Sequence, residues 1–272
     1  MAKIIYSESR HVLLALTLTI VLSCNGSVAH EEFETYESGV YYDLNYPLVP
    51  AQDQSSLPDS ILALYEIDAS RLTVRMMLAL GGEAAGEIEL PLFLKESLTN
   101  GLIAIYLASD LAPRDSVVEI YAVHTFWSPP LYEIIVSADS SRSFMRAWGA
   151  GERLTGRSAI DDLMIEYDLY LEHYYDWPGS HAVVLKSVRP LNVTALANRF
   201  NSIAGVSYAE INGYCCDGSD ITVEIIDLKW VYSFWLKWGD CPSGCISSHV
   251  WSFAVGTDGV VTFLEPSGSI LP

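Results

Sequence analysis

The segment between residues 131 and 212 constrains the fold of this chain more than any other part of it. It alternates between short runs rich in β-branched and aromatic residues and longer stretches in which apolar residues recur with a helical period. The predicted strands are 131–136, 169–177, 182–188 and 206–210, and the predicted helices are 158–168 and 192–204. The elements therefore follow one another in the order β-α-β-β-α-β.

This order is that of ferredoxin-like domains, and it predicts an α+β fold with a ferredoxin-like module at residues 129–212. A small α+β region at 61–128 is expected before it, with a strand at 72–80, a helix from about residue 91 to 107 and a buried strand at 117–126. An antiparallel β extension at 213–272 is expected after it. Its predicted strands are 221–226, 230–238, 249–255 and 260–264.

The first 23 residues indicate export from the cytoplasm. Lys3 and Arg10 give a positively charged start, and the apolar run at 12–22 is too short to remain as a membrane-spanning helix. Small residues before Cys24 match the box that bacterial lipoprotein signal peptidase cleaves. We therefore predict a signal peptide at 1–23, a lipid anchor on Cys24 that attaches the protein to the membrane of the cell envelope, and a tether at 24–60. Cleavage after Ala29 would instead give a secreted soluble protein.

The charge of the chain argues against nucleic acid as a partner. Fifteen Lys and Arg residues stand against thirty-four Asp and Glu residues, a formal net charge of −19. Binding to a phosphate backbone needs a stripe of clustered basic residues, which the sequence does not contain. Acidic surfaces of this kind usually serve solubility.

Four late cysteines predict covalent cross-links. In an oxidising compartment Cys215, Cys216, Cys241 and Cys245 suggest two disulfides, with no pairing fixed by sequence alone. We favour a bridge that closes the 241–245 loop, which leaves a vicinal bridge between Cys215 and Cys216. The spacings C-C and C-x3-C do not match paired zinc knuckles, so neither a metal nor another cofactor is expected.

A limited resemblance appears at the end of the predicted module. The segment Leu196–Asn212, which contains Gly-Val-Ser-Tyr-Ala-Glu-Ile-Asn at 205–212, resembles the last helix and strand of subtilisin-type protease propeptides and their stand-alone inhibitor relatives. That family commonly ends in Tyr-Ala-Glu-Pro-Asn, and Ile211 replaces the proline here. The resemblance implies that Tyr208, Glu210 and Asn212 lie near a contact edge with a protease. The longer pattern, including the 239–245 loop, resembles uncharacterised exported bacterial lipoproteins.

Aromatic residues mark a second possible binding surface. Four of the seven tryptophans, Trp230, Trp235, Trp238 and Trp251, fall in the predicted β extension. Trp230 and Trp235 differ in strand parity, so both faces of that sheet carry aromatic bulk. These two residues are candidates for contact with a protein partner, and packing within the core is the alternative.

No catalytic signature stands out. The chain lacks a Gly-x-Ser-x-Gly elbow and a His-Glu-x-x-His motif. His173, Asp176 and His181 are candidates for a metal or acid/base cluster across a hairpin, the alternative being exposed polar positions on a sheet. Asp217 and Asp220 are candidates for a calcium loop, although they lack the alternating spacing of a strong one, and a plain turn is the alternative.

These observations favour a non-enzymatic, exported, lipid-anchored protein with a binding or structural role and a protein partner of unknown identity. A propeptide-like inhibitor of a subtilisin-type protease is the first alternative. A hydrolase of unrecognised class is the second.

Overall fold

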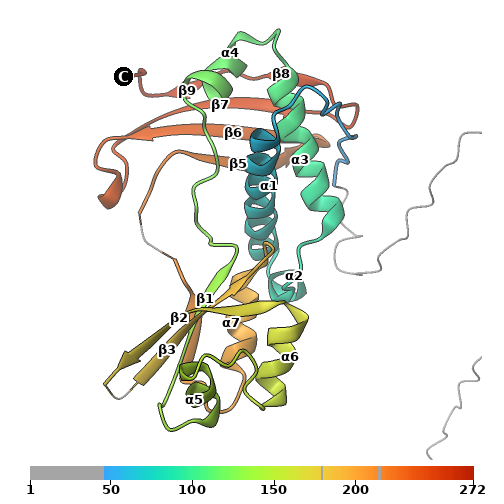
Figure 1. Ribbon diagram of the computed structural model, residues 1–272. Coiled ribbons are helices and arrows are strands. Elements are labelled where there is room, and N and C mark those ends of the chain that lie inside the picture. Colours follow the sequence, from blue (N-terminus) through green and yellow to red (C-terminus); the bar gives the residue numbers. More distant parts are fainter. Residues whose placement is uncertain (1–45, 179, 214–215) are drawn as a thin grey trace, which may run out of the picture. The chain divides into compact units, whose positions relative to one another are not determined.

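The computed structural model describes residues 46–178, 180–213 and 216–272 (Figure 1). These residues form a mixed α+β fold with two antiparallel sheets, which confirms the predicted fold class. The predicted signal peptide, Cys24 and the tether as far as residue 45 lie outside the described residues. None of the described helices is long and apolar enough to cross a membrane.

Residues 129–212 form the four-stranded module that the sequence predicts. Its elements are β1 (Glu133–Ala138), α5 (Ser143–Gly149), α6 (Ser158–Glu166), β2 (Leu169–Trp177), β3 (Ser180–Ser187), α7 (Val193–Asn201) and β4 (Tyr208–Ile211). The strand order is β2-β3-β1-β4, and every neighbouring pair is antiparallel. This is the ferredoxin-like arrangement, except that two short helices, α5 and α6, stand where one helix was predicted.

Local sequence signals explain the last helix of the module. Asn192 caps α7, because its Oδ1 accepts a hydrogen bond from the backbone N–H of Ala195 at 3.3 Å. The apolar stripe of α7, which includes Leu196 and Phe200, is buried against the sheet. Gly205 follows with a φ of +90°, a conformation that favours glycine after a helix. The start predicted for this helix is therefore confirmed, whereas its end at Asn201 comes three residues before the predicted one.

The second sheet lies in the C-terminal part of the chain. It contains β5 (Asp220–Ile226), β6 (Lys229–Trp238), β7 (Ser247–Val255) and β8 (Val261–Phe263), in that order, and β9 (Ser267–Gly268) pairs with β7. A short 3-10 turn at Cys241–Ser243 lies between β6 and β7. The four predicted strands of the β extension are confirmed to within two residues at each end.

Most of residues 59–120 are helical. The elements are α1 (Asp59–Leu80), α2 (Gly82–Gly86), α3 (Leu92–Leu107), α4 (Ala112–Asp115) and a π-helical turn at Ser116–Ile120. The predicted helix at 91–107 is confirmed as α3, but the predicted strands at 72–80 and 117–126 are wrong. Residues 72–80 belong to α1, whose middle part is buried, so that no amphipathic stripe distinguishes it from a buried strand.

The segment at 121–129 is not a strand, and side chains satisfy its backbone in place of a neighbouring strand. Asp68 of α1 accepts hydrogen bonds from the backbone N–H and the hydroxyl of Thr125, at 2.8 and 2.6 Å. Arg75 donates to the carbonyl oxygens of Phe126 and Ser128. Because each buried backbone group needs a partner, these bonds allow an apolar run to lie inside the protein without entering a sheet.

The helices α1 and α3 share one core with the five-stranded sheet (Figure 1). Leu98 and Leu102 of α3 are completely buried in the same cluster as Trp230, Tyr232 and Phe253 of the sheet. The chain thus builds this core from its two ends, and the ferredoxin-like module is inserted between them in sequence.

The close packing of Tyr232 against Gly101 predicts how much an added methyl group at residue 101 would destabilise the protein. A Cβ atom on Gly101 of α3 would lie 2.1 Å from the hydroxyl of Tyr232, which is buried and donates to the carbonyl oxygen of Leu98. Gly101→Ala should therefore lower the free energy of unfolding by about 2 kcal/mol in urea denaturation, although alanine is the better helix former.

Gly86→Ala provides the matched control, because a Cβ atom at Gly86 meets nothing within 4 Å. Its stability should equal that of the wild type or exceed it slightly. Equal stabilities for the Gly101→Ala and Gly86→Ala proteins would contradict the packing described for Tyr232.

Candidate functional site

The ferredoxin-like sheet has two different faces. Val136 of β1 and Val183 and Leu185 of β3 point to the helix side and are buried with residues of α5, α6 and α7. Strand side chains alternate between faces, so residues 133, 135 and 137 of β1 and 182, 184 and 186 of β3 lie on the opposite side. Within the described residues no helix packs on that side, which we call the open face (Figure 1).

Three cross-strand rows of side chains cover the open face. From β2 to the opposite edge they are Tyr175–Ala182–Ser137–Tyr208, His173–Val184–Ile135–Glu210 and Tyr170–Lys186–Glu133. The first row places a tyrosine on each edge strand and two small, completely buried residues between them. The aromatic groups therefore stand at the two margins of a floor of small side chains.

An aromatic ladder runs along the edge strand β2. We give this name to His173, Tyr175 and Trp177, three residues spaced by two positions on the open face. The rings of His173 and Tyr175 have centroids 4.4 Å apart, and those of Tyr175 and Trp177 are stacked at 4.9 Å with an interplanar angle of 17°. The ladder is largely accessible, with Trp177 45 % exposed and His173 also exposed. Stacking holds these rings in one geometry at little entropic cost.

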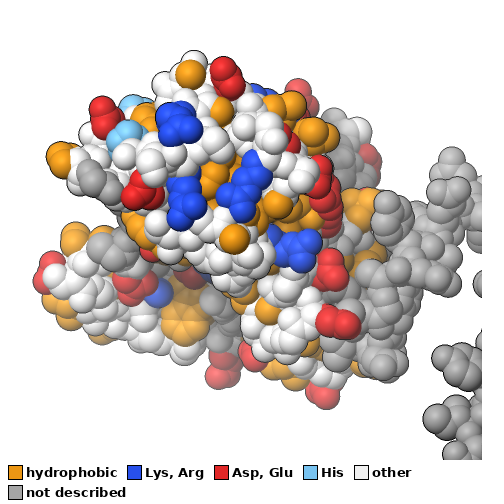
Figure 2. All heavy atoms as spheres, turned by 90° about the horizontal axis from the view of Figure 1, so that it is seen from below, with side chains coloured by type: hydrophobic (Ala, Val, Ile, Leu, Met, Phe, Trp, Pro, Cys, Tyr) orange, Lys and Arg blue, Asp and Glu red, His pale blue; other side chains and the backbone are white. Residues whose placement is uncertain are grey.

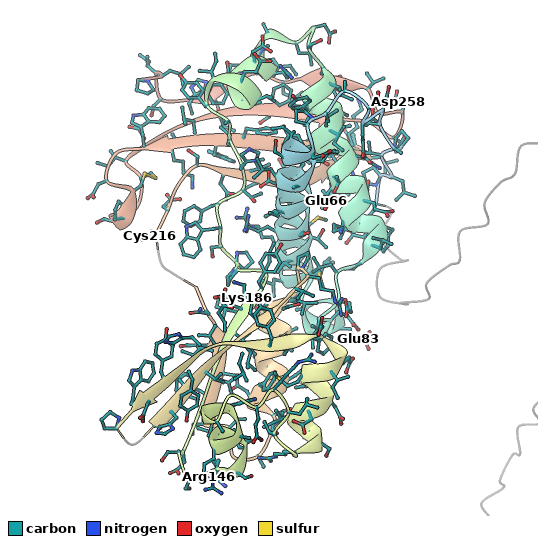
Figure 3. The ribbon with its side chains drawn as sticks, in the orientation of Figure 1. Glu66, Glu83, Arg146, Lys186, Cys216 and Asp258 are labelled. Carbon is teal, nitrogen blue, oxygen red and sulfur yellow. A yellow bond between two sulfur atoms is a disulfide. The ribbon has the colours of Figure 1, made fainter. Side chains whose placement is uncertain are left out.

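The third row is charged. Lys186, labelled in Figure 3, places its Nζ 3.0 Å from a carboxylate oxygen of Glu133 and 3.3 Å from one of Glu172. Hydrogen bonds to Glu133 and Glu172 raise the pKa of Lys186 above its ordinary value. Asn212 donates to the other oxygen of Glu133 at 2.8 Å. This end of the open face is polar, in contrast to the aromatic margin along β2.

The free edge of β4 is partly closed by a side chain. Asn201, the last residue of α7, donates to the carbonyl oxygen of Ala209 at 2.7 Å and accepts from its N–H at 2.6 Å. These are groups that an added strand would need. The side chain amide of Asn201 thus takes the place of a neighbouring strand at the centre of β4.

The predicted cluster of His173, Asp176 and His181 does not assemble. His181 and Asp176 lie on the helix side, where Nε2 of His181 is 3.0 Å from the Asp176 carboxylate and Nδ1 bonds the Tyr174 hydroxyl. His173 points to the open face instead. Among the residues that the structure describes, no group of three His, Cys, Asp or Glu side chains can hold a metal ion.

The residues predicted to bind a protein partner lie on two different sheets and differ in exposure. Tyr208 and Glu210 lie on the open face, and Tyr208 is 41 % exposed. Trp230 is completely buried and donates to the carbonyl oxygen of Pro47 at 2.6 Å, so it is a core residue and not a surface contact. Trp235 lies on the other side of its sheet and donates to the Thr222 hydroxyl at 3.0 Å.

The late loops are held by a disulfide and by ion pairs. Cys241 and Cys245 are bonded, which confirms the favoured pairing. Cys215 lies outside the described residues, so the second bridge stays a prediction. Lys237 binds the Asp217 carboxylate at 2.6 Å and Arg75 binds Asp220 at 2.9 Å. The two aspartates predicted as a calcium loop therefore face different cations.

The sequence reasoning missed the aromatic ladder as a unit. It assigned 169–177 to a strand with aromatic weight, and the alternation of His173, Tyr175 and Trp177 was available in that strand. The bulge at Glu172 could not be predicted from the sequence. This bulge places Tyr170 on the same face as the ladder.

Asp217 provides a prediction of pH dependence. A hydrogen bond from Lys237, together with the backbone N–H groups of Gly218 and Cys245, holds the pKa of Asp217 below its ordinary value. A lowered pKa in the folded state adds stability above the unfolded pKa of about 3.9, and this contribution is lost as the pH falls through the folded value.

Because the Asp217 carboxylate is 36 % exposed, its contribution should be no more than about 1 kcal/mol. We expect Asp217→Asn to be less stable than the wild type at pH 7, and the difference to shrink as the pH falls from the unfolded pKa of about 3.9 through the lower folded-state pKa, measured by urea denaturation. A stability difference of the same size throughout this pH range would show that the loss is not electrostatic.

Comparison of the chain with models of protein families, with curated proteins and with solved structures gave no match in any of the three.

Proposed function

We propose that this is a non-enzymatic exported protein, lipid-anchored through Cys24 to the cell envelope, and that its open face binds a protein partner. The observation that carries this proposal is the first cross-strand row with the aromatic ladder beside it. Tyr175 lies on β2 and Tyr208 lies on β4, the two edge strands of the four-stranded sheet. The other rings of the aromatic ladder extend along β2.

The composition of the open face favours a protein partner. Tyrosine and tryptophan are enriched among the residues that dominate binding energy at protein interfaces. Ala182 and Val184 are buried beneath the face, so contacts with a partner would come from the accessible rings, and stacking already orders those of Tyr175 and Trp177. The ion-paired Lys186 and Glu133 supply the polar rim that such interfaces have.

The geometry of β4 favours binding across the face over extension of the sheet. A partner that added a strand beside β4 would have to displace Asn201 from both of its hydrogen bonds with Ala209. A partner that covers the open face leaves those bonds intact.

The first experiment captures partners with the chain as bait, by crosslinking and mass spectrometry of the exported proteins of its own organism. Combining Tyr175→Ser with Tyr208→Ser should reduce recovery of the specific partner tenfold or more, because an aromatic ring is lost from each margin of the face. Trp235→Ser is the matched control, since it removes an aromatic group from the other sheet and should leave recovery unchanged.

Urea denaturation of the double variant separates loss of binding from loss of folding. Both tyrosines are partly exposed, so the variant should remain folded. A folded double variant that still captures the partner would exclude the open face, and loss with Trp235→Ser alone would move the site to the five-stranded sheet. A glycan as the captured species would overturn the assignment to a protein.

A propeptide-like protease inhibitor is the second candidate. The sheet order of the module and the position of Tyr208 and Glu210 on the open face support it, because the strand that carries them is the one that resembles the propeptides. Here the chain should inhibit a subtilisin-type protease, and Tyr208→Ala with Glu210→Ala should abolish inhibition. Lack of any inhibition at micromolar concentration would exclude this candidate and leave the binding proposal standing.

A further inference from the structure

The basic residues of this acidic chain are unevenly distributed. Of the described residues, six Lys and Arg side chains form ion pairs with carboxylates: Arg75, Arg114, Arg153, Lys186, Arg189 and Lys237. Four arginines of the ferredoxin-like module have no carboxylate within 4.0 Å in the described part of the chain. These are Arg142, Arg146, Arg157 and Arg199, which we call the arginine patch.

The fold brings the patch together on the helix side of the module. Arg142 and Arg146 are four residues apart at the start of α5, Arg157 precedes α6, and Arg199 lies in the last turn of α7. Residues spaced by four positions at a helix lie on the same side of it. Figure 2 shows Lys and Arg side chains gathered on this end of the module, and Figure 3 shows the labelled Arg146 at its margin.

Contacts with the backbone and with one aromatic ring fix the positions of two of the guanidinium groups. Arg157 donates to the carbonyl oxygen of Ala204 and lies over the ring of Phe144, 5.4 Å from its centroid. Arg142 approaches the next residue, Gly205, whose Cβ position would be 3.4 Å from the guanidinium carbon. Arg157 and Arg199 also line one open hollow of about 520 Å³ between α6 and α7. Backbone and aromatic contacts thus position the cations, and their charge is not neutralised there.

Acidic residues border the patch without pairing with it. Asp162 and Glu166 line the same hollow as Arg157 and Arg199, and Asp139 accepts a hydrogen bond from the N–H of Ser141. The remaining acidic residues of the chain act through solvent, where screening limits their effect to about 8–10 Å at physiological salt. Asp139, Asp162 and Glu166 lie close enough to reduce the positive potential of the patch, but none of them forms an ion pair with its arginines in the described part of the chain.

We propose that the arginine patch binds the phosphate groups of an anionic phospholipid bilayer. A guanidinium group donates two parallel hydrogen bonds to a phosphate, and four of them spread over three helices match a surface array of phosphates better than a single ligand. The helices pack on the face of the sheet opposite to the open face, so a module bound through the patch presents the open face away from the lipid. This inference goes beyond the proposed function and does not depend on it.

The test measures cosedimentation with lipid vesicles. The full chain carries Cys24→Ser, so that no acyl group contributes, and any effect of the apolar run at 12–22 is common to all variants. We expect binding to vesicles of phosphatidylcholine mixed with phosphatidylglycerol, weakening as salt is raised, and little binding to phosphatidylcholine alone. Arg142→Gln combined with Arg146→Gln should weaken binding at least tenfold, at about fivefold for each arginine.

Two further variants separate charge from folding. Arg142→Lys with Arg146→Lys keeps the charge and should retain most of the binding. Lys95→Gln with Lys229→Gln removes two cations that lie outside the module and form no ion pair in the described residues, and it should change nothing. Circular dichroism checks that each variant is folded.

Several outcomes would overturn the proposal. These are equal binding to neutral and anionic vesicles, equal loss in the Lys95 and Lys229 control, or preference for a soluble polyanion such as polyglutamate or an oligonucleotide over the vesicles. The Tyr175→Ser and Tyr208→Ser protein should still bind vesicles, so failure of the open face as a partner site and failure of the patch remain distinguishable.

Discussion

The arrangement of this protein depends on one guanidinium group. Arg75 of α1 donates to the carbonyl oxygens of Phe126 and Ser128, immediately before the ferredoxin-like module, and to the carboxylate of Asp220 and the carbonyl oxygen of Ile221, at the start of the next strand, β5. Five rigid donors in one plane make arginine suited to such a junction. One side chain thus binds the segment that enters the module and the first strand that follows it. Arg71, one turn earlier on α1, and Asp68, two turns earlier, also bind the entering segment.

The parts of the fold that sequence predicted are those whose side chains divide cleanly between core and solvent. In the module, α7 has a polar cap at Asn192 and an apolar stripe, and the strands are bounded by turn residues. Helix α1 could not be recognised, because the polar residues Asp68 and Arg71 are buried beside Leu72 and obscure the apolar pattern. The run at 117–126 has the composition of a strand, and only the positions of Asp68 and Arg75 in space explain why it is not one.

The candidate site was predictable where strand parity alone decides it. Tyr208 and Glu210 follow from alternation along β4, and the three-residue spacing of His173 and Asp176 already places them on opposite faces of a regular strand. The arginine patch is different in kind. Its members come from three helices. The spacing of Arg142 and Arg146 is local, but Arg157 comes close to their helix only through tertiary contacts with residues 144 and 204, which no local pattern contains.

The division of the larger core between the two ends of the chain has a consequence for the order of folding. The strands and helices of the module come from one contiguous stretch, to which Ile88 adds a core residue, whereas α1 and α3 must wait for a sheet that begins more than 110 residues later in the chain. Contacts this distant in sequence slow folding, because the conformational entropy of a long loop is lost before the burial of apolar surface stabilises the closed loop. If the chain is exported with its amino terminus first, α1 and α3 cross the membrane long before the strands that they pack against. This core then cannot form early, and the part of the chain that has not yet crossed stays unfolded for export.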